Sequence, residues 1–277
     1  MKPPAFAYLR ADSADTAARA LTEHGDEARI LAGDQSLMAV LNMRLPQPSV
    51  LIDISRSESL AEVKLDGQWM TIGAAATQAS IEWRPKLKSE VPLLALAVPH
   101  ISHFQIRNKG TVAGSIAHAD PSAELPLCLL ALEGEVMLRS AKRQRRVKAN
   151  DFFTGMLSTA RQNDELLEAV RFPTGRRGEG YGFEEFSVRH GDFAVCAVAA
   201  VADAKRLRIA VGGVADRPAA RDFPLLQGSA LDDALNDFAW SLDARDEPQA
   251  SAVLRRQLVR RLGHTAAIQA MLNRDAL

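Results

Sequence analysis

The sequence predicts an α+β fold with a large N-terminal region and a small C-terminal α+β domain. Short apolar runs typical of strands alternate with helical patterns along the chain. Two hairpin patterns in the middle of the chain predict antiparallel pairing there. Residues 174–182, TGRRGEGYG, are rich in glycine and charge and form the best candidate linker. We divide the chain into residues 1–176, with subdomains of about 1–56 and 57–176, and residues 177–277.

The composition is that of a globular protein with balanced charge. Of 277 residues, 47% are apolar and 25% are charged, which is ordinary for a soluble chain of one or two domains. Lys and Arg number 34, as do Asp and Glu, so the basic surplus that nucleic-acid binding requires is missing. The first residues, MKPPAFAYLRADSADT, lack the apolar stretch of a signal peptide, and no apolar run approaches the roughly 20 residues of a membrane span. We therefore expect a soluble, cytoplasmic protein with no nucleic-acid partner.

The two cysteines, Cys128 and Cys196, each lie within an apolar run, LPLCLLAL and FAVCAVAAVA. Cysteine in such a setting behaves as a small hydrophobic residue, so we expect buried, reduced thiols. Two thiols do not ligate an iron–sulfur cluster, which normally takes four. Any iron–sulfur chemistry would therefore belong to another chain.

The first fifty residues predict helix, strand, helix and strand in that order. Asp12 or Ser13 caps the first helix, Gly25 ends it, and ARILAG follows as a short strand. Ser36 caps a second helix, SLMAVLNMRL, which Pro46 terminates, and VLIDI is a second buried strand. A βαβ unit with a glycine at its first turn is a candidate anion site, because loop amides and a helix N-terminus converge there.

From about Ser57 the pattern changes to hairpins and short helices. AEVKLDGQWMTIG predicts a hairpin that turns at Asp66 and Gly67, and Thr77 caps the helix that follows. PLLALAVPHIS predicts a short apolar helix, and GTVAGSIAHADPSAELPLCLLAL predicts a small-residue loop before a buried helix. GEVMLRS and RRVKAND predict a second hairpin. Its turn is expected to contain most of a basic run, which consists of Lys142, Arg143, Arg145, Arg146 and Lys148. We favour a solvent-exposed hairpin tip over a docking surface for these residues.

The C-terminal region predicts strands at FEEFSV, FAVCAVAAVA and RLRIAVGGV, and helices at LDDALNDFAW and SAVLRRQLVRRLGHTAAIQAML. The glycines of GEGYG, residues 178–182, do not stand between a strand and a helix, which argues against a phosphate loop. The pair Gly212 and Gly213 predicts a strand bend or turn. The last helix is expected to present an apolar face with arginines displayed beside it: Val253, Leu254, Leu258 and Leu262, with Arg255, Arg256, Arg260 and Arg261.

Two loops carry the strongest indication of a ligand. AGDQS, residues 32–36, and TVAGS, residues 111–115, each combine small residues with a terminal hydroxyl. Small residues let the backbone approach a ligand closely, and successive backbone amides form an anion-binding nest. Ser36 and Ser115 add hydrogen-bonding hydroxyls. Together the loops predict a site for a diphosphate.

Four segments of the chain resemble the flavoprotein (medium) subunit of molybdenum hydroxylases. They are AGDQSLMAVLNMRLPQPSVLIDI, IRNKGTVAGSIAHADPSAELP, DFFTGMLST with ELLEAVRFP, and FEEFSVRHGDFAVCAVAA, in the family's order and spacing. Carbon monoxide dehydrogenase and the N-heterocycle hydroxylases are most similar, and xanthine dehydrogenase carries the same module within a longer chain. The resemblance implies a two-subdomain FAD-binding fold of the vanillyl-alcohol-oxidase (PCMH) type over residues 1–176. It also implies the family's small C-terminal domain over residues 177–277.

The resemblance also implies positions that contact FAD. The loops at residues 31–36 and 111–115 would hold the diphosphate, and Asp120 and Glu124 would contact the ribityl or ribose part. Ile101 and Phe193 would lie near the flavin, and Leu166 and Leu167 would make apolar contacts. The full expected set is Leu31, Ala32, Gly33, Asp34, Gln35, Ser36, Leu37, Ile101, Thr111, Val112, Ala113, Gly114, Ser115, Ala117, Asp120, Glu124, Leu166, Leu167 and Phe193.

Asp34 and Ala113 depart from the family, which usually has glycine at both positions. Ala113 is tolerable where its backbone φ is negative. A carboxylate facing a diphosphate would be repelled. We therefore predict that the Asp34 side chain points away from the phosphates, where it could cap the following helix alongside Ser36.

The remaining conspicuous polar residues could suggest a metal site or a hydrolase triad, and neither interpretation is favoured. His100 and His103 have a spacing that suits two ligands on one helical face, but no third ligand is near, so local hydrogen bonding near the flavin is favoured over a metal. Ser115, His118 and Asp120 are the residue types of a hydrolase triad, but no GxSxG elbow is present. We expect no metal ligand and no catalytic residue.

The resemblance implies a subunit that relays electrons. A molybdenum-binding large subunit would oxidise the substrate, and a small subunit with [2Fe-2S] clusters would deliver electrons to FAD, in a dimer of heterotrimers. FAD would pass them to an external acceptor such as NAD⁺, a quinone or oxygen; the sequence shows no Rossmann fingerprint for NAD. Two alternatives stay open. One is a self-sufficient FAD-dependent oxidase of the same fold, and the other is a flavin-free structural subunit.

Overall fold

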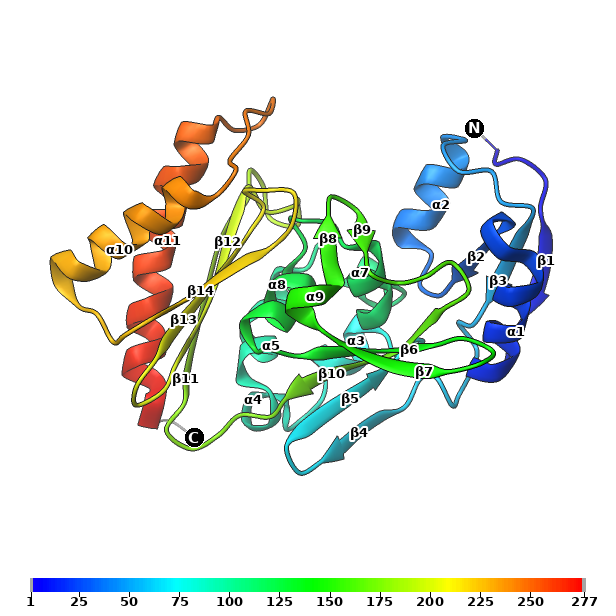
Figure 1. Cartoon of the computed structure of the whole chain (residues 1–277), viewed down its shortest axis with the longest axis horizontal. Helices are drawn as coiled ribbons and strands as arrows, with labels where there is room; N and C mark the ends of the chain where they lie inside the picture. The colour runs from blue at the N-terminus through cyan, green and yellow to red at the C-terminus, as the bar shows by residue number, and fades with distance from the viewer. Residues whose placement is uncertain (1, 276–277) are drawn as a thin grey trace.

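A computed structural model describes residues 2–275 and shows three sheets in a row (Figure 1). A three-stranded sheet at the N-terminus is followed by a central five-stranded sheet and a C-terminal four-stranded sheet, each with its own helices. The predicted α+β fold is confirmed. None of the helices in these residues combines the length and apolar character needed to cross a membrane.

The N-terminal sheet is parallel, with strand order β1-β3-β2. The Ser13 hydroxyl accepts a hydrogen bond from the Thr16 amide and caps α1, and Gly25 ends the helix at φ 52°, both as predicted. β1 is absent from the sequence prediction because its four residues are mostly exposed and show no apolar run. The elements are β1 (Ala7–Arg10), α1 (Ala14–His24), β2 (Ala28–Leu31), α2 (Gln35–Asn42) and β3 (Val50–Asp53).

The start of α2 differs from the prediction. The helix begins at Gln35, so Ser36 lies inside its first turn and is not the cap. Asp34 occupies the N-cap position with a left-handed φ of 52°, and its side chain makes no capping bond to any residue that the structure describes. In that backbone conformation the carboxylate does not reach the amides of the first turn, unlike the extended N-cap residues Ser13 and Thr77.

The central sheet has the order β4-β5-β10-β6-β7, with antiparallel pairing throughout. Both predicted hairpins are present, and Asp66 pairs with Trp69 across the first turn. Most of the basic run lies on edge strand β7 rather than in the turn, because the turn closes between Arg139 and Gln144. The strands are β4 (Val63–Asp66), β5 (Trp69–Gly73), β6 (Glu135–Arg139), β7 (Gln144–Lys148), β10 (Leu166–Pro173) and the small pair β8 (Phe153–Gly155) and β9 (Ser158–Thr159).

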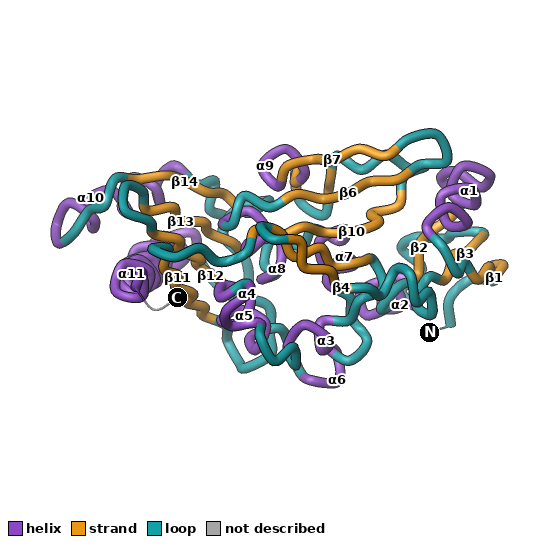
Figure 2. Tube along the Cα trace, turned by 90° about the horizontal axis from the view of Figure 1, so that it is seen from below, coloured by secondary structure: helices purple, strands orange, loops and turns teal. Residues whose placement is uncertain are grey.

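Short helices cover one side of the central sheet, where α3, α5 and α6 lie below it in Figure 2. Thr77 caps α3 as predicted, and α8 is buried along its whole length. The small-residue segment predicted as a loop instead contains α7, capped by the Thr111 hydroxyl, which accepts a hydrogen bond from the Gly114 amide. The helices are α3 (Gln78–Glu82), α4 (Leu87–Glu90), α5 (Pro92–Ala97), α6 (Phe104–Arg107), α7 (Val112–His118), α8 (Glu124–Ala131) and α9 (Ala149–Phe152).

The C-terminal sheet, in the order β11-β12-β13-β14, is packed on both faces. One face contacts α5 and α8, and the other contacts α10 and α11. A Cβ on Gly182 would lie 2.9 Å from the carbonyl carbon of Ala266, so this glycine allows close helix packing. The elements are β11 (Gly180–Phe186), β12 (Cys196–Ala202), β13 (Leu207–Gly212), β14 (Ala219–Phe223), α10 (Gly228–Ser241) and α11 (Ala252–Leu272).

The buried face of α11 differs from the predicted one at the start of the helix. Val253 is 62% exposed, whereas Arg255 is buried. The Arg255 guanidinium donates to the backbone carbonyls of Val195 and Gly213 and pairs with Glu247. Val195 precedes β12 and Gly213 follows β13, so these carbonyls lie outside the hydrogen bonds of the sheet. Because a buried carbonyl requires a donor, the Arg255 side chain lies in the interior. The predicted turn is confirmed, since β13 ends at Gly212 and Gly213 has φ 79°.

Both cysteines are buried and free, as predicted. Burial raises the pKa of Cys196 to about 12, so its thiol stays protonated at neutral pH. Cys128 lies within α8 and is equally buried, and its pKa is raised in the same direction. Because neither thiol ionises readily at neutral pH, neither is expected to act as a nucleophile.

Candidate cofactor-binding site

Two adjoining cavities separate the N-terminal sheet from the central region. The larger has a volume of about 600 Å³ and the smaller about 280 Å³. They share Ala32, Gly114 and His118, so together they form one elongated cleft. An elongated ligand fits such a shape.

The two predicted loops meet in the wall of the larger cavity, next to Ala32 and Gly114, which both cavities share. A Cβ on Gly33 would lie 2.6 Å from the Cα of Gly110 and 2.8 Å from the amide nitrogen of Thr111. These distances are far below van der Waals contact, so only glycine permits this approach. The backbone amide of Gln78 donates a hydrogen bond to the Gly110 carbonyl at 2.8 Å and so fixes the start of the second loop.

Seventeen of the nineteen expected residues line the cleft. The other two are Leu31, within β2, and Val112, which is fully buried in α7. Those in the larger cavity are Ala32, Gly33, Asp34, Gln35, Ser36, Leu37, Ile101, Thr111, Gly114, Ser115, Asp120, Glu124 and Phe193. Those in the smaller cavity are Ala32, Ala113, Gly114, Ala117, Leu166 and Leu167.

The first turn of α2 supplies free backbone donors to this cleft. Gln35, Ser36 and Leu37 all line the larger cavity, and the first amides of a helix have no intrahelical acceptor. The positive end of the helix dipole lies at the same place. The arrangement therefore favours an anionic group in the larger cavity, next to Ala32 and Gly114, which both cavities share.

The backbone at residue 34 favours glycine, the residue that the resemblance led us to expect there. Asp34 is exposed and has φ 52°, a left-handed conformation that glycine adopts without strain and aspartate at moderate cost. The side-chain Nε2 of Gln35 donates to the Gly33 carbonyl at 2.7 Å and to the Asp34 carboxylate at 3.3 Å. Ala113 lies within α7, where φ is negative, so the condition for tolerating it is met.

Two carboxyl groups lie at the floor of the larger cavity. Asp120 accepts a hydrogen bond from the Ser122 amide at 2.9 Å, which shapes the turn before α8. Burial, reinforced by the charge of Asp120, raises the pKa of Glu124 to about 7. Burial, reinforced by the charge of Glu124, also raises the pKa of Glu185 on β11 to about 8. Near pH 7 the Glu124 carboxyl is therefore about half protonated, whereas an ordinary glutamate would be fully ionised.

In the part of the chain that the structure describes, His100, His103 and His190 do not line the larger cavity and form aromatic contacts instead of the predicted local hydrogen bonds. His103 and His190 line a separate cavity of about 460 Å³. His100 packs on Phe183 with ring centroids 5.1 Å apart, and His103 packs on His190 at 5.9 Å. Burial, reinforced by His190, lowers the pKa of His100. Phe193 is 65% exposed at the margin of the larger cavity. Among residues 2–275, no three His, Cys, Asp or Glu side chains are grouped so that they could hold a metal ion.

Several lining residues were not in the expected set. His118 lies in the HADPSAELP segment and lines both cavities, so its motif was the signal that could have found it. Ile106, Gly110, Gly191, Asp192 and Glu165 also lie in segments that carry the resemblance. Others lie outside those segments, among them Gln78 and Ser102 in the larger cavity and Arg29, Arg161 and Asn163 in the smaller.

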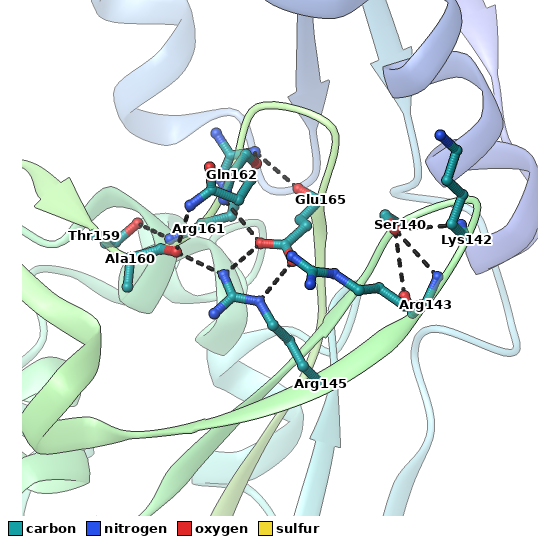
Figure 3. Close-up of polar contacts among 9 residues, drawn as sticks. All are labelled: Ser140, Lys142, Arg143, Arg145, Thr159, Ala160, Arg161, Gln162 and Glu165. Atoms are coloured by element: carbon teal, nitrogen blue, oxygen red, sulfur yellow. Dashed lines mark hydrogen bonds and ion pairs between the residues drawn. The ribbon is translucent and has the colours of Figure 1, made fainter.

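An arginine cluster holds the loop that walls the smaller cavity. Figure 3 shows the buried carboxylate of Glu165 between Arg145 and the backbone of Gln162. Arg145 donates to both carboxylate oxygens at 2.7 Å and to the Ala160 carbonyl at 2.7 Å. Arg161 donates to the carbonyls of Gln162 and Glu165 at 2.9 and 2.8 Å. Strand β7 is thereby fastened to residues 160–165.

Replacing Glu165 with leucine is expected to lower the free energy of unfolding by roughly 2–3 kcal/mol, because Arg145 and the Gln162 amide lose a buried acceptor. Urea denaturation measures this change, and Asp164→Asn at an exposed neighbour is the control. Burial raises the pKa of Glu165, but the hydrogen bonds from Arg145 and the Gln162 amide, together with the charges of Arg145 and Arg143, lower it overall. Its stabilisation is therefore present above the ordinary pKa of 4.5 and is lost as pH falls further. Equal stability of the leucine variant and wild type would show that the hydrogen bonds to Glu165 do not stabilise the fold.

Residues 4–175 match the family model described as FAD binding domain in molybdopterin dehydrogenase. The chain is 38% identical to the nicotine 6-hydroxylase medium subunit of Paenarthrobacter nicotinovorans, covering 98% of this chain and 99% of that one. It is 35% identical to the glyceraldehyde dehydrogenase medium chain of Sulfolobus acidocaldarius, covering 94% and 96%. Among solved structures, reconstituted CO dehydrogenase from Oligotropha carboxidovorans superposes with a TM-score of 0.94 at 28% identity, covering 98% and 99%.

Proposed function

This chain belongs to the family of FAD-binding domains in molybdopterin dehydrogenases and is an oxidoreductase subunit, and from that premise we propose that it relays electrons within a molybdenum hydroxylase complex. The single observation that carries the proposal is the backbone contact of Gly33 with residues 109–111 in the wall of an elongated cleft. A dinucleotide has that shape, with two ring systems joined by a narrow diphosphate.

We place the diphosphate of FAD at the junction of the two cavities. The free amides of α2's first turn would bind the phosphate oxygens, and Ser36 and Ser115 line the same cavity. The larger cavity suits the flavin and ribityl half by volume, and the smaller cavity, lined by Leu166 and Leu167, suits the adenosine half. Bound FAD would supply the redox chemistry between partner clusters and an external acceptor.

The residues of this chain bind and orient the cofactor and need not move substrate atoms. Molybdenum and iron–sulfur clusters would reside on a large and a small partner subunit, as a dimer of heterotrimers. The relatives named above are medium subunits or chains, which supports this division. Two reduced, buried cysteines fit a cytoplasmic location.

The same observations favour the relay over its two alternatives. A self-sufficient oxidase needs a substrate pocket with its own acid or base, and the C-terminal sheet that would have to supply it is packed on both faces. A flavin-free structural subunit would have no need of a glycine where two loops touch. The backbone also accommodates both departures from the family, Asp34 and Ala113.

Purification of the chain from its source organism tests the proposal. We expect flavin absorbance bands, released FAD, and co-elution with molybdenum and iron. Flavin without either metal would favour the self-sufficient oxidase. Metals without flavin, in protein that also fails to bind added FAD, would favour the structural subunit.

Removing the charge of Asp34 is expected to raise FAD affinity severalfold, because this exposed residue lines the larger cavity and its negative charge lies near the proposed diphosphate position whichever way the side chain points. Asp34→Asn keeps a side chain that tolerates a left-handed backbone, whereas Asp34→Gly also relieves the strain. Both variants should bind FAD more tightly in fluorescence titrations, with less gain at high salt. An improvement in the glycine variant alone would assign the effect to the backbone and contradict the charge explanation.

A further inference from the structure

Gln78 places a buried carboxamide in the wall of the larger cavity. It is the first residue of α3, its exposure is only 6%, and it lines the larger cavity but not the smaller one. The backbone amide of Gln78 donates a hydrogen bond to the Gly110 carbonyl, and this bond holds Gln78 beside the second loop. Its side chain lies against Gly110, since a Cβ built there would be 3.3 Å from Oε1.

The carboxamide oxygen of Gln78 has no hydrogen-bond partner among the residues that the structure describes. A buried acceptor left without a donor costs about 1–3 kcal/mol, and groups of this kind are rare outside functional sites. The cavity wall here includes Ile101 and Ile106, so an apolar side chain would fit this environment at no such cost. The unpaired oxygen therefore points to a partner supplied by a ligand.

We propose that the Gln78 carboxamide binds a hydroxyl of the polyol (ribityl) segment of the cofactor and so positions the flavin half. This inference rests on the proposed FAD binding. An acceptor needs a donor, and a diphosphate has none to offer. A hydroxyl both donates and accepts, so it satisfies the carboxamide in either rotation. The polyol is the segment next to the diphosphate on the side of the larger cavity, where Gln78 lies.

Gln78→Leu in the full chain, purified with its co-eluting partners and freed of flavin, tests this contact. FAD contains the polyol, whereas ADP contains only the diphosphate and adenosine. We expect the Kd for FAD to rise about tenfold, the fold-change of one lost hydrogen bond to a buried group, and the Kd for ADP to change less than twofold. The unfolding midpoint of the flavin-free variant should equal or exceed that of wild type, because an unpaired polar group has been removed. Gln257→Leu, at an exposed position of α11, is the matched control.

Three results would overturn the inference while leaving FAD binding intact. The first is an unchanged Kd for FAD. The second is an equal loss of ADP affinity, which would place the contact on the diphosphate or adenosine side. The third is a lower unfolding midpoint in the flavin-free variant, which would make Gln78 a structural residue. Wild-type protein that binds no FAD would instead overturn the proposed function, and this inference with it.

Discussion

Gly33→Ala is expected to lower FAD affinity at least 100-fold. The added methyl carbon would lie 2.6 Å from the Cα of Gly110 and 2.8 Å from the Thr111 amide nitrogen. All of the opposing atoms belong to the backbone, so no side-chain rotation relieves the overlap and the two loops must separate. A loss of about 3 kcal/mol in binding corresponds to this change in affinity and is within the range of overpacking costs.

The measurement is the Kd for FAD together with the flavin content of the purified variant. Gly155→Ala is the matched control, because a Cβ there meets nothing nearer than Ser158 at 3.9 Å and the backbone has no left-handed φ. The control should retain wild-type flavin. Full flavin occupancy in Gly33→Ala would show that the loops need not touch in the bound state, and the proposed diphosphate position would then be wrong.

The parts of the fold that follow local rules could be predicted from the sequence. The Ser13 and Thr77 hydroxyls cap helices where the pattern places them, and Gly25 ends the first helix. The turn between Asp66 and Trp69 closes the first hairpin. Each of these depends on residues within a few positions of one another, so a short window of sequence contains the whole interaction.

The remainder depends on contacts between distant segments. Arg255 is buried because carbonyls at Val195 and Gly213 need a donor, and nothing in the helical pattern reveals them. The two proposed diphosphate loops were predicted from their small residues and terminal hydroxyls, but the reason for Gly33 is a neighbour 77 positions away at Gly110. Gln78 carried no sequence signal, because its unpaired oxygen becomes visible only when the cavity is assembled.

Burial of Glu124 makes the stability of the fold depend on pH. This residue begins α8, is almost fully buried at the cavity floor, and its ordinary pKa of 4.5 is raised to about 7. A raised pKa means that the folded protein holds the proton more tightly than the unfolded chain. The associated stability is therefore fully present below about pH 4.5 and is lost as pH rises through about 7. At pH 8 the ionised carboxylate costs the flavin-free fold roughly 3 kcal/mol.

Glu124→Gln is therefore expected to stabilise the flavin-free protein by roughly 3 kcal/mol at pH 8 and to leave its stability unchanged near pH 4.5. Urea denaturation at both pH values measures the difference, and Glu58→Gln, an exposed position, should show no effect at either. Some loss with rising pH should persist in the variant, because burial also raises the pKa of Glu185. Equal stabilisation at both pH values would show that the glutamine improves packing and that no proton is involved. Destabilisation at pH 8 would show that a hydrogen-bond donor in the fold stabilises the Glu124 carboxylate. The raised pKa of Glu124 would then be wrong.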